Sequence, residues 1–162
     1  MADKFDPVRD ADAEARATVR HLLADARTAA LAFVDPDTGA PAISRIGFGL
    51  APDCSALTLL SDLALHTRAL RADPRAALLL GEPGPRGDPL NSARLSVSVT
   101  AHFVANADPA RAHLREIWLR DHPKSKLYVD FADFSFVQFE VNGASLNGGF
   151  GRAYRLAATD LT

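Results

Sequence analysis

The sequence has a single cysteine, Cys54, and only a small net charge. One cysteine among 162 residues excludes an internal disulfide and any metal cluster held by several cysteines. Lysine and arginine number 18 and aspartate and glutamate 20, which gives a formal net charge of −2. Surfaces that bind nucleic acid are clearly basic. The composition therefore indicates a protein that does not bind nucleic acid.

Long hydrophobic runs are also missing. No apolar stretch approaches the roughly 20 residues needed to cross a bilayer. The segment Met1–Asp6 has no basic region followed by an apolar core, so it does not resemble a secretion signal. No two histidines have the i, i+4 spacing that favours zinc. We therefore expect a soluble, cytoplasmic protein with no membrane partner and no metal site.

A hydrophobic content of 48% is enough for one compact domain over residues 1–162. We expect this domain to have an N-terminal helix (1–27), a barrel (28–156) and a short tail (157–162). Asp6 and Pro7 favour the start of the helix, as cap and first helical residue. The apolar stripe expected on this helix consists of Val8, Ala15, Val19, Leu22 and Leu23.

Short apolar or alternating runs predict most of the other elements. Strands are expected over residues 28–34, 42–50, 56–60, 76–80, 94–105, 134–141 and 154–156, and further helices over 61–73 and 109–121. Asp35–Gly39 predicts a hairpin turn, and Asn142-Gly143 predicts another at the end of the long phenylalanine-rich strand. This order is not the alternation of a parallel α/β sheet. It favours a mainly β (α+β) protein, an antiparallel barrel of six or seven strands with flanking helices.

Residues 56–73 contain the strand-to-helix junction around which the rest of the predicted fold is arranged. An apolar strand runs into Ser61 and Asp62, which suit a helix N-terminus, and Asp73-Pro74 ends the helix. Leu63 and Leu70 are expected to face inward. A strand that leads into a helix N-terminus favours an anion, because backbone N–H groups are free there.

His66, Thr67 and Arg68 follow within two turns. They would add a possible cation, a hydroxyl and a guanidinium, a set that suits a phosphate. The alternative is a short amphipathic helix whose polar residues only face water.

Several motifs, in this order, resemble the flavin-binding split-barrel superfamily of pyridoxamine-phosphate oxidases, and within it the haem-utilisation branch. These motifs are Pro41–Arg45, Leu60–Leu70 with Asp73–Arg75, Gly87–Leu90 before Arg94–Val97, Asp130–Phe134, and Gly148–Ala153. The resemblance covers residues 28–156. It implies a homodimer of split barrels with a small-molecule ligand at each subunit seam.

The resemblance also implies which residues bind the cofactor. Arg45, Ser61, His66, Thr67 and Arg68 would contact the phosphate and ribityl chain of FMN. Backbone groups of Leu60 and Ser61 would lie along the flavin ring edge. Arg94 would reach the flavin from the second subunit.

The sequence departs from the family in ways that bear on function. The basic residue expected shortly after Arg45 is replaced by Gly47–Leu50, so oxidation of pyridoxamine phosphate is not expected. The tail after Gly151 has no histidine, the residue that the haem-degrading relatives use to bind iron. We therefore expect an FMN-binding protein, a flavin-dependent oxidoreductase of unknown substrate. The alternatives are a haem-binding or haem-degrading protein, with His66 or Arg152 near the propionates, and a non-catalytic ligand carrier.

Overall fold

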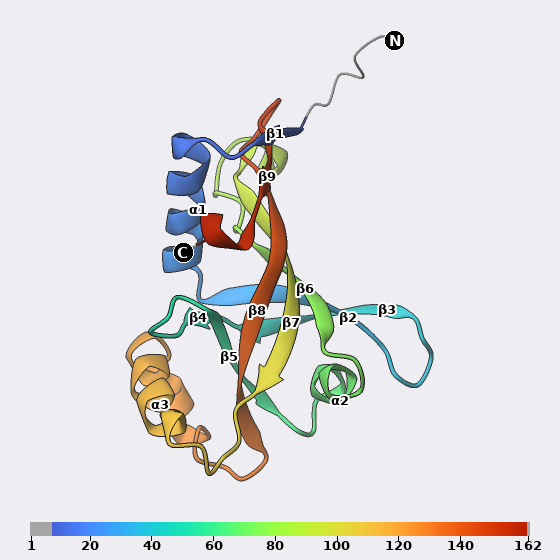
Figure 1. Ribbon diagram of the computed structural model, residues 1–162, viewed down its shortest axis with the longest axis vertical. Coiled ribbons are helices and arrows are strands. Elements are labelled where there is room, and N and C mark those ends of the chain that lie inside the picture. The colour runs from blue at the N-terminus through green and yellow to red at the C-terminus, as the bar shows by residue number, and fades with distance from the viewer. Residues whose placement is uncertain (1–7, 162) are drawn as a thin grey trace.

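The computed structural model describes residues 8–161, in which one mainly antiparallel sheet curls into a barrel with helices outside it (Figure 1). The helices are α1 (Ala13–Asp25), α2 (Leu65–Ala72) and α3 (Ala110–Asp121). The strands are β1 (Val8–Asp10), β2 (Thr28–Val34), β3 (Pro41–Gly47), β4 (Gly49–Leu50), β5 (Ala56–Ser61), β6 (Arg75–Leu80), β7 (Arg94–Phe103), β8 (Phe134–Asn147) and β9 (Ala153–Leu156). The mainly β class expected from the sequence is confirmed, with nine strands in these residues in place of six or seven.

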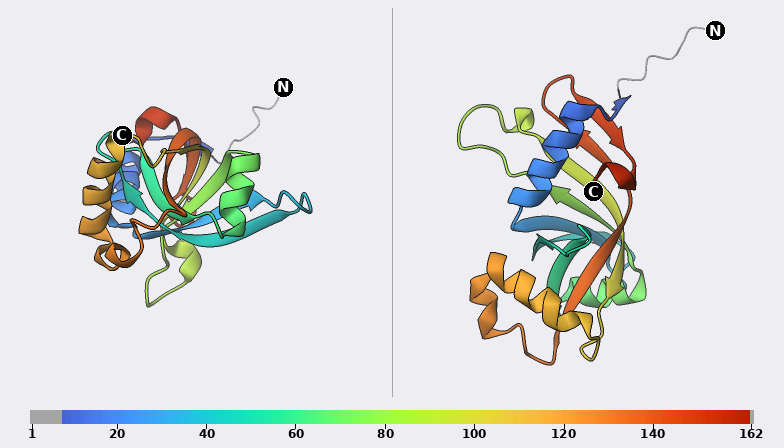
Figure 2. Two further views of the ribbon diagram at one scale, coloured as in Figure 1. Left: turned by 90° about the horizontal axis from the view of Figure 1, so that it is seen from below. Right: turned by 60° about the vertical axis from the view of Figure 1, so that its left-hand side comes forward.

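The long strand β8 is what closes the barrel. The strands follow the order β1-β9-β8-β7-β6-β2-β3, and β8 also pairs with β5, which pairs with β4. Because β4 follows β3 after one residue, the β4–β5 pair lies beside β3, and the sheet closes on itself as a barrel (Figure 2). The Thr58 hydroxyl in β5 donates a 2.7 Å hydrogen bond to the Gly47 carbonyl at the end of β3. The barrel interior is filled by leucine, valine and phenylalanine, among them Leu31, Leu95 and Phe139.

Helix α1 lies along the upper part of the barrel (Figure 1). Ala15, Val19 and Leu23 are buried as expected, but the helix begins later than the sequence predicted. Its N-cap is Asp12, whose carboxylate accepts the Ala15 N–H at 2.8 Å. The expected start at Asp6-Pro7 lies outside the described residues.

The three residues of β1, predicted as helix, form a parallel strand beside β9. A pairing with residues 145 positions away leaves no local signal, and this explains the error.

The predicted turn at Asn142-Gly143 is also wrong. Strand β8 continues through both residues to Asn147. Ser98 pairs with Gly143 and Val99 with Val141, so Asn142 is an extra residue on β8. Its side-chain amide donates to the Thr100 hydroxyl at 3.0 Å. Asparagine and glycine therefore mark a β-bulge, a feature that the same residue types also favour.

A second cluster of buried residues lies between α3 and the sheet, outside the barrel. Trp118 is 3% exposed and lies at its centre. Its ring stacks on His122, with centroids 3.9 Å apart, and meets Phe136 edge-on at 6.2 Å. The same ring lies 2.9 Å from where a Cβ at Gly47 would be. Glycine at this position therefore lets α3 approach the strand closely. Within residues 8–161, no helix is long and apolar enough to cross a membrane.

Candidate functional site

The corner between β5 and α2, residues 61–68, holds most of the predicted cofactor contacts. Ser61 pairs with Phe134 as the last residue of β5, so it is not the helix N-cap that the sequence predicted. A three-residue turn follows, and α2 begins at Leu65 with Ala64 as its N-cap. The helix ends before Pro74, as expected. Leu63, expected to face inward, is 87% exposed because it lies in that turn, while Leu70 is buried.

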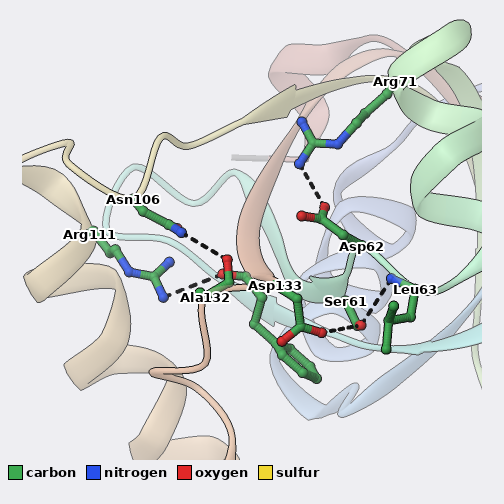
Figure 3. Close-up of polar contacts among 9 residues, drawn as sticks. Ser61, Asp62, Leu63, Arg71, Asn106, Arg111, Ala132 and Asp133 are labelled. Carbon is green, nitrogen blue, oxygen red and sulfur yellow. Dashed lines mark hydrogen bonds and ion pairs between the residues drawn. The ribbon is translucent and has the colours of Figure 1, made fainter.

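The Ser61 hydroxyl is already engaged within the chain. It donates to the Asp133 carboxylate at 2.7 Å and accepts the Leu63 N–H at 3.2 Å (Figure 3). The backbone N–H of Asp62 also donates to the Asp133 carbonyl, at 2.7 Å. Asp133 belongs to one of the motifs that carried the family resemblance, but nothing in the sequence predicted its hydrogen bond with Ser61. A carboxylate at this position disfavours a phosphate at the same hydroxyl, because like charges repel.

The three predicted contacts on α2 differ in environment. His66 is half-buried, with its ring edge-on to Phe33 at a centroid distance of 6.3 Å. Burial lowers the pKa of the His66 imidazole, which is therefore neutral at pH 7. Thr67 is fully buried, and its hydroxyl has no hydrogen-bond partner within residues 8–161. Arg68 is exposed and makes a 3.3 Å ion pair with Asp37 at the tip of the β2–β3 hairpin.

Among the five histidines, His66 combines partial burial with a ring that has no hydrogen bond to any described residue. His102 pairs with Glu140 at 2.8 Å, and His113 lies 3.8 Å from Glu116. His122 bonds to the Phe48 carbonyl at 2.8 Å, and His21 is exposed on α1. In the described residues, no group of three or more metal-binding side chains is arranged to hold an ion.

Arg45 lies on the outer sheet face, which we define as the outward side of β2, β3 and β6. It is opposite Ala30, and Ala30 is in turn opposite Leu79. Val34, Ile43 and Leu79 are exposed by 47%, 70% and 43% on this face. Arg45 itself is exposed and has no partner among the described residues. The face is therefore apolar, with small alanines between the larger side chains and a free guanidinium beside them.

Two predicted residues lie away from these groups. Leu60 is 3% exposed and packs in the barrel core, so a ligand could reach only its backbone. Arg94 begins β7, at the end of that strand remote from α2 (Figure 1). Its guanidinium donates to the Leu90 carbonyl at 2.9 Å. A contact from Arg94 to the β5–α2 corner therefore needs a second copy of the chain.

The closed antiparallel barrel with a strand-to-helix corner defines a split-barrel protein. The family model described as pyridoxamine 5'-phosphate oxidase matches residues 15–147, and the chain belongs to that family. This confirms the resemblance drawn from the sequence motifs.

Two of the similar proteins are named for heme. The chain is 33% identical over 102 residues to the heme oxygenase HOZ of Arabidopsis thaliana chloroplasts, a match covering 63% of this chain and 30% of that protein. The structure of a heme binding protein from Mycobacterium smegmatis is 28% identical, with a TM-score of 0.82, over 93% of this chain and 61% of the other. Campylobacter jejuni ChuZ shares the fold at 16% identity, with a TM-score of 0.83 over 95% of this chain and 63% of its own. The chain thus spans less than a third of the plant relative and about three fifths of the bacterial ones.

Proposed function

We propose that this protein binds haem at a seam between two copies of the chain. The observation that carries the proposal is the outer sheet face, an exposed apolar surface with the unpaired Arg45 beside it. Haem is a planar apolar ring with two carboxylates, so it matches an apolar surface next to a free guanidinium. The plant and mycobacterial relatives, both named for heme, support this choice over the flavin.

Two residues of the chain fit haem. Because His66 packs on Phe33, which points to the opposite side of β2 from the face that carries Arg45, the two would reach one haem from different copies of the chain. Arg45 would pair with a propionate, since no carboxylate of residues 8–161 pairs with it. His66 would offer a neutral imidazole nitrogen to the iron, because burial keeps its pKa low and no described residue forms a hydrogen bond with its ring nitrogens. Bound haem would supply the redox chemistry, and the protein would supply the imidazole, the arginine and an apolar surface that excludes water.

FMN is the second candidate, with a flavin-dependent oxidoreductase as the resulting activity. It is favoured by the buried Thr67 hydroxyl, which lacks a partner and lies beside Arg68. It ranks second because the chain's own carboxylates already occupy two of the expected phosphate contacts. Ser61 is bound to Asp133 and Arg68 to Asp37, and a phosphate would have to displace or adjoin both carboxylates. A carrier without catalysis would use the same residues for either ligand.

We expect replacement of His66 by alanine to weaken haem binding about 10- to 100-fold and to alter the Soret band, because an iron ligand is lost. Titration with haemin, followed by visible absorption, measures both changes. His113→Ala is the matched control, since His113 is exposed on α3 beside Glu116 and should leave binding unchanged. An unaltered spectrum and affinity in His66→Ala would remove His66 from the proposal.

Two copies of the chain are expected to meet through the outer sheet face. A stable interface buries about 800 Å² on each partner, and an exposed apolar surface on one sheet face is typical of such contacts. Ile43→Glu places a charge where the side chain is 70% exposed, so it should convert a dimer into a monomer without unfolding it. Leu127→Glu, at a residue 80% exposed beyond α3, should leave the dimer intact. Gel filtration with light scattering gives the masses, and a monomeric wild-type protein would refute the seam.

A further inference from the structure

A cavity of about 380 Å³, wide open to solvent on one side, lies at the lower end of the barrel, between α2, the end of β7 and the start of β8. Its lining includes Asp62, Arg71, Phe103, Asn106 and Ser135. None of the residues proposed to hold haem or flavin belongs to the lining. Ligand pockets of small molecules have volumes of about 300–1,000 Å³, so this cavity suits a ligand at the small end of that range.

A charged pair lies at this cavity. Arg71 donates to the Asp62 carboxylate at 2.8 Å (Figure 3), and the two side chains are 48% and 45% exposed. The Arg71 guanidinium also covers the Phe103 ring, with its central carbon 4.0 Å from the ring centroid. Two of its nitrogens and one Asp62 oxygen have no partner among the described residues. The pair is therefore held in place and still has both donors and an acceptor to offer.

Two uncharged polar groups complete the lining. Ser135 is only 8% exposed, and its hydroxyl has no partner in residues 8–161. The hydroxyl oxygen is not among the buried atoms that lack a partner, so solvent reaches it. A molecule in the cavity can therefore take the place of water and form a hydrogen bond with it. Asn106 donates from its side-chain nitrogen to the Ala132 carbonyl at 3.3 Å. This bond fixes the side chain and leaves its oxygen free to accept.

We propose that this cavity binds a free α-amino acid with an apolar side chain. A carboxylate would accept from the remaining Arg71 nitrogens and from the Ser135 hydroxyl. An adjacent ammonium would donate to the remaining Asp62 carboxylate oxygen and to the side-chain oxygen of Asn106. A zwitterion can bond to the remaining Arg71 donors and to the remaining Asp62 oxygen together, whereas a lone anion or cation can bond to only one of them. Phe103 and the neighbouring Val104 and Ala105 provide the apolar wall. The proposal does not depend on which cofactor the protein binds.

Nuclear magnetic resonance titrations of the full chain with three probes test this ligand class. L-Phenylalanine carries both charges, 3-phenylpropionate only the carboxylate and 2-phenylethylamine only the ammonium. We expect saturable shifts with L-phenylalanine, at the amides of residues 103–106 and 132–135, and at least tenfold weaker binding of the other two. Equal binding of all three, or no saturable shift with L-phenylalanine, would overturn the proposal.

Variants show whether the named side chains make the contacts. Arg71→Gln should weaken L-phenylalanine binding at least tenfold, and Ser135→Ala severalfold. Arg75→Gln is the matched control, because Arg75 follows α2, is 82% exposed and pairs with Asp73; it should bind as the wild type does. Ser135→Ala carries the test if Arg71→Gln does not fold. Wild-type affinity in a folded Arg71→Gln, or in Ser135→Ala, would contradict the assignment.

Discussion

Replacement of Trp118 by alanine is expected to lower the free energy of unfolding by about 3–5 kcal/mol. The ring is 3% exposed and is the centre of the cluster between α3 and the sheet. It stacks on His122, and its N–H donates to the Ser125 hydroxyl at 3.1 Å. Alanine would leave a cavity and a buried Ser125 with one partner fewer. Gly47 lies close to the ring, but a glycine has no side chain that could move in to fill the space.

Urea unfolding followed by circular dichroism measures this loss for Trp118→Ala. Leu127→Ala is the control, because Leu127 is apolar but 80% exposed; a change within about 0.5 kcal/mol is expected there. If Trp118→Ala lost less than about 1 kcal/mol, α3 would not be packed on the sheet as described.

Gly81→Ala is the second substitution with a large expected effect. Gly81 directly follows β6 and has a φ of +103°, a conformation that costs an L-residue about 1–2 kcal/mol. A Cβ there would lie 2.4 Å from the Ala93 carbonyl oxygen, and relieving that clash adds about 1–3 kcal/mol. Neither the new Cβ nor the Ala93 carbonyl oxygen can move without moving the backbone. The two costs therefore add to a loss of about 2–5 kcal/mol in the free energy of unfolding.

Gly39→Ala separates the two costs for Gly81. Gly39 also has a positive φ, +71°, but a Cβ there would meet nothing within 4 Å. Its expected loss is about 1–2 kcal/mol, measured by the same urea unfolding. Equal losses at the two glycines would mean that the close approach of Ala93 to Gly81 is wrong.

Local patterns were sufficient to predict the strands whose neighbours are near in sequence. Strand β2 has the predicted bounds, and its hairpin to β3 follows from Asp35–Gly39. The alternation in residues 94–105 likewise predicted β7. In these segments burial on one face is enough to determine the period of the sequence.

Features that depend on distant partners were not predicted. Strand β1 exists because β9 offers it an edge, and Asn142 bulges because β7 fixes the register around it. Ser61 looks like an N-cap in isolation. In the structure it instead extends β5 by pairing with β8, and its hydroxyl goes to Asp133. Each error arose where residues more than 40 positions away decided between two local conformations.

Some features of the candidate site were likewise predicted from the sequence, and others depend on distant residues. The sequence identified His66 as the histidine of interest, and the structure adds its partial burial and ring nitrogens that bond to no described residue. The sequence could not show that Asp37 and Asp133 occupy Arg68 and Ser61. Nor did it reveal the cavity beside Arg71 or the apolar face around Ile43, because both join side chains from several strands. The carboxylates on Ser61 and Arg68 and the apolar face are our reasons for proposing haem in place of FMN.

Competition between haemin and FMN tests directly which of the two ligands the protein prefers. The purified protein is mixed with equal amounts of both ligands in excess, passed through gel filtration, and its visible spectrum is recorded. We predict a Soret band that elutes with the protein, with no flavin bands beside it. Flavin bands that remain with the protein in place of a Soret band would contradict it, and would make the β5–α2 corner a phosphate site after all.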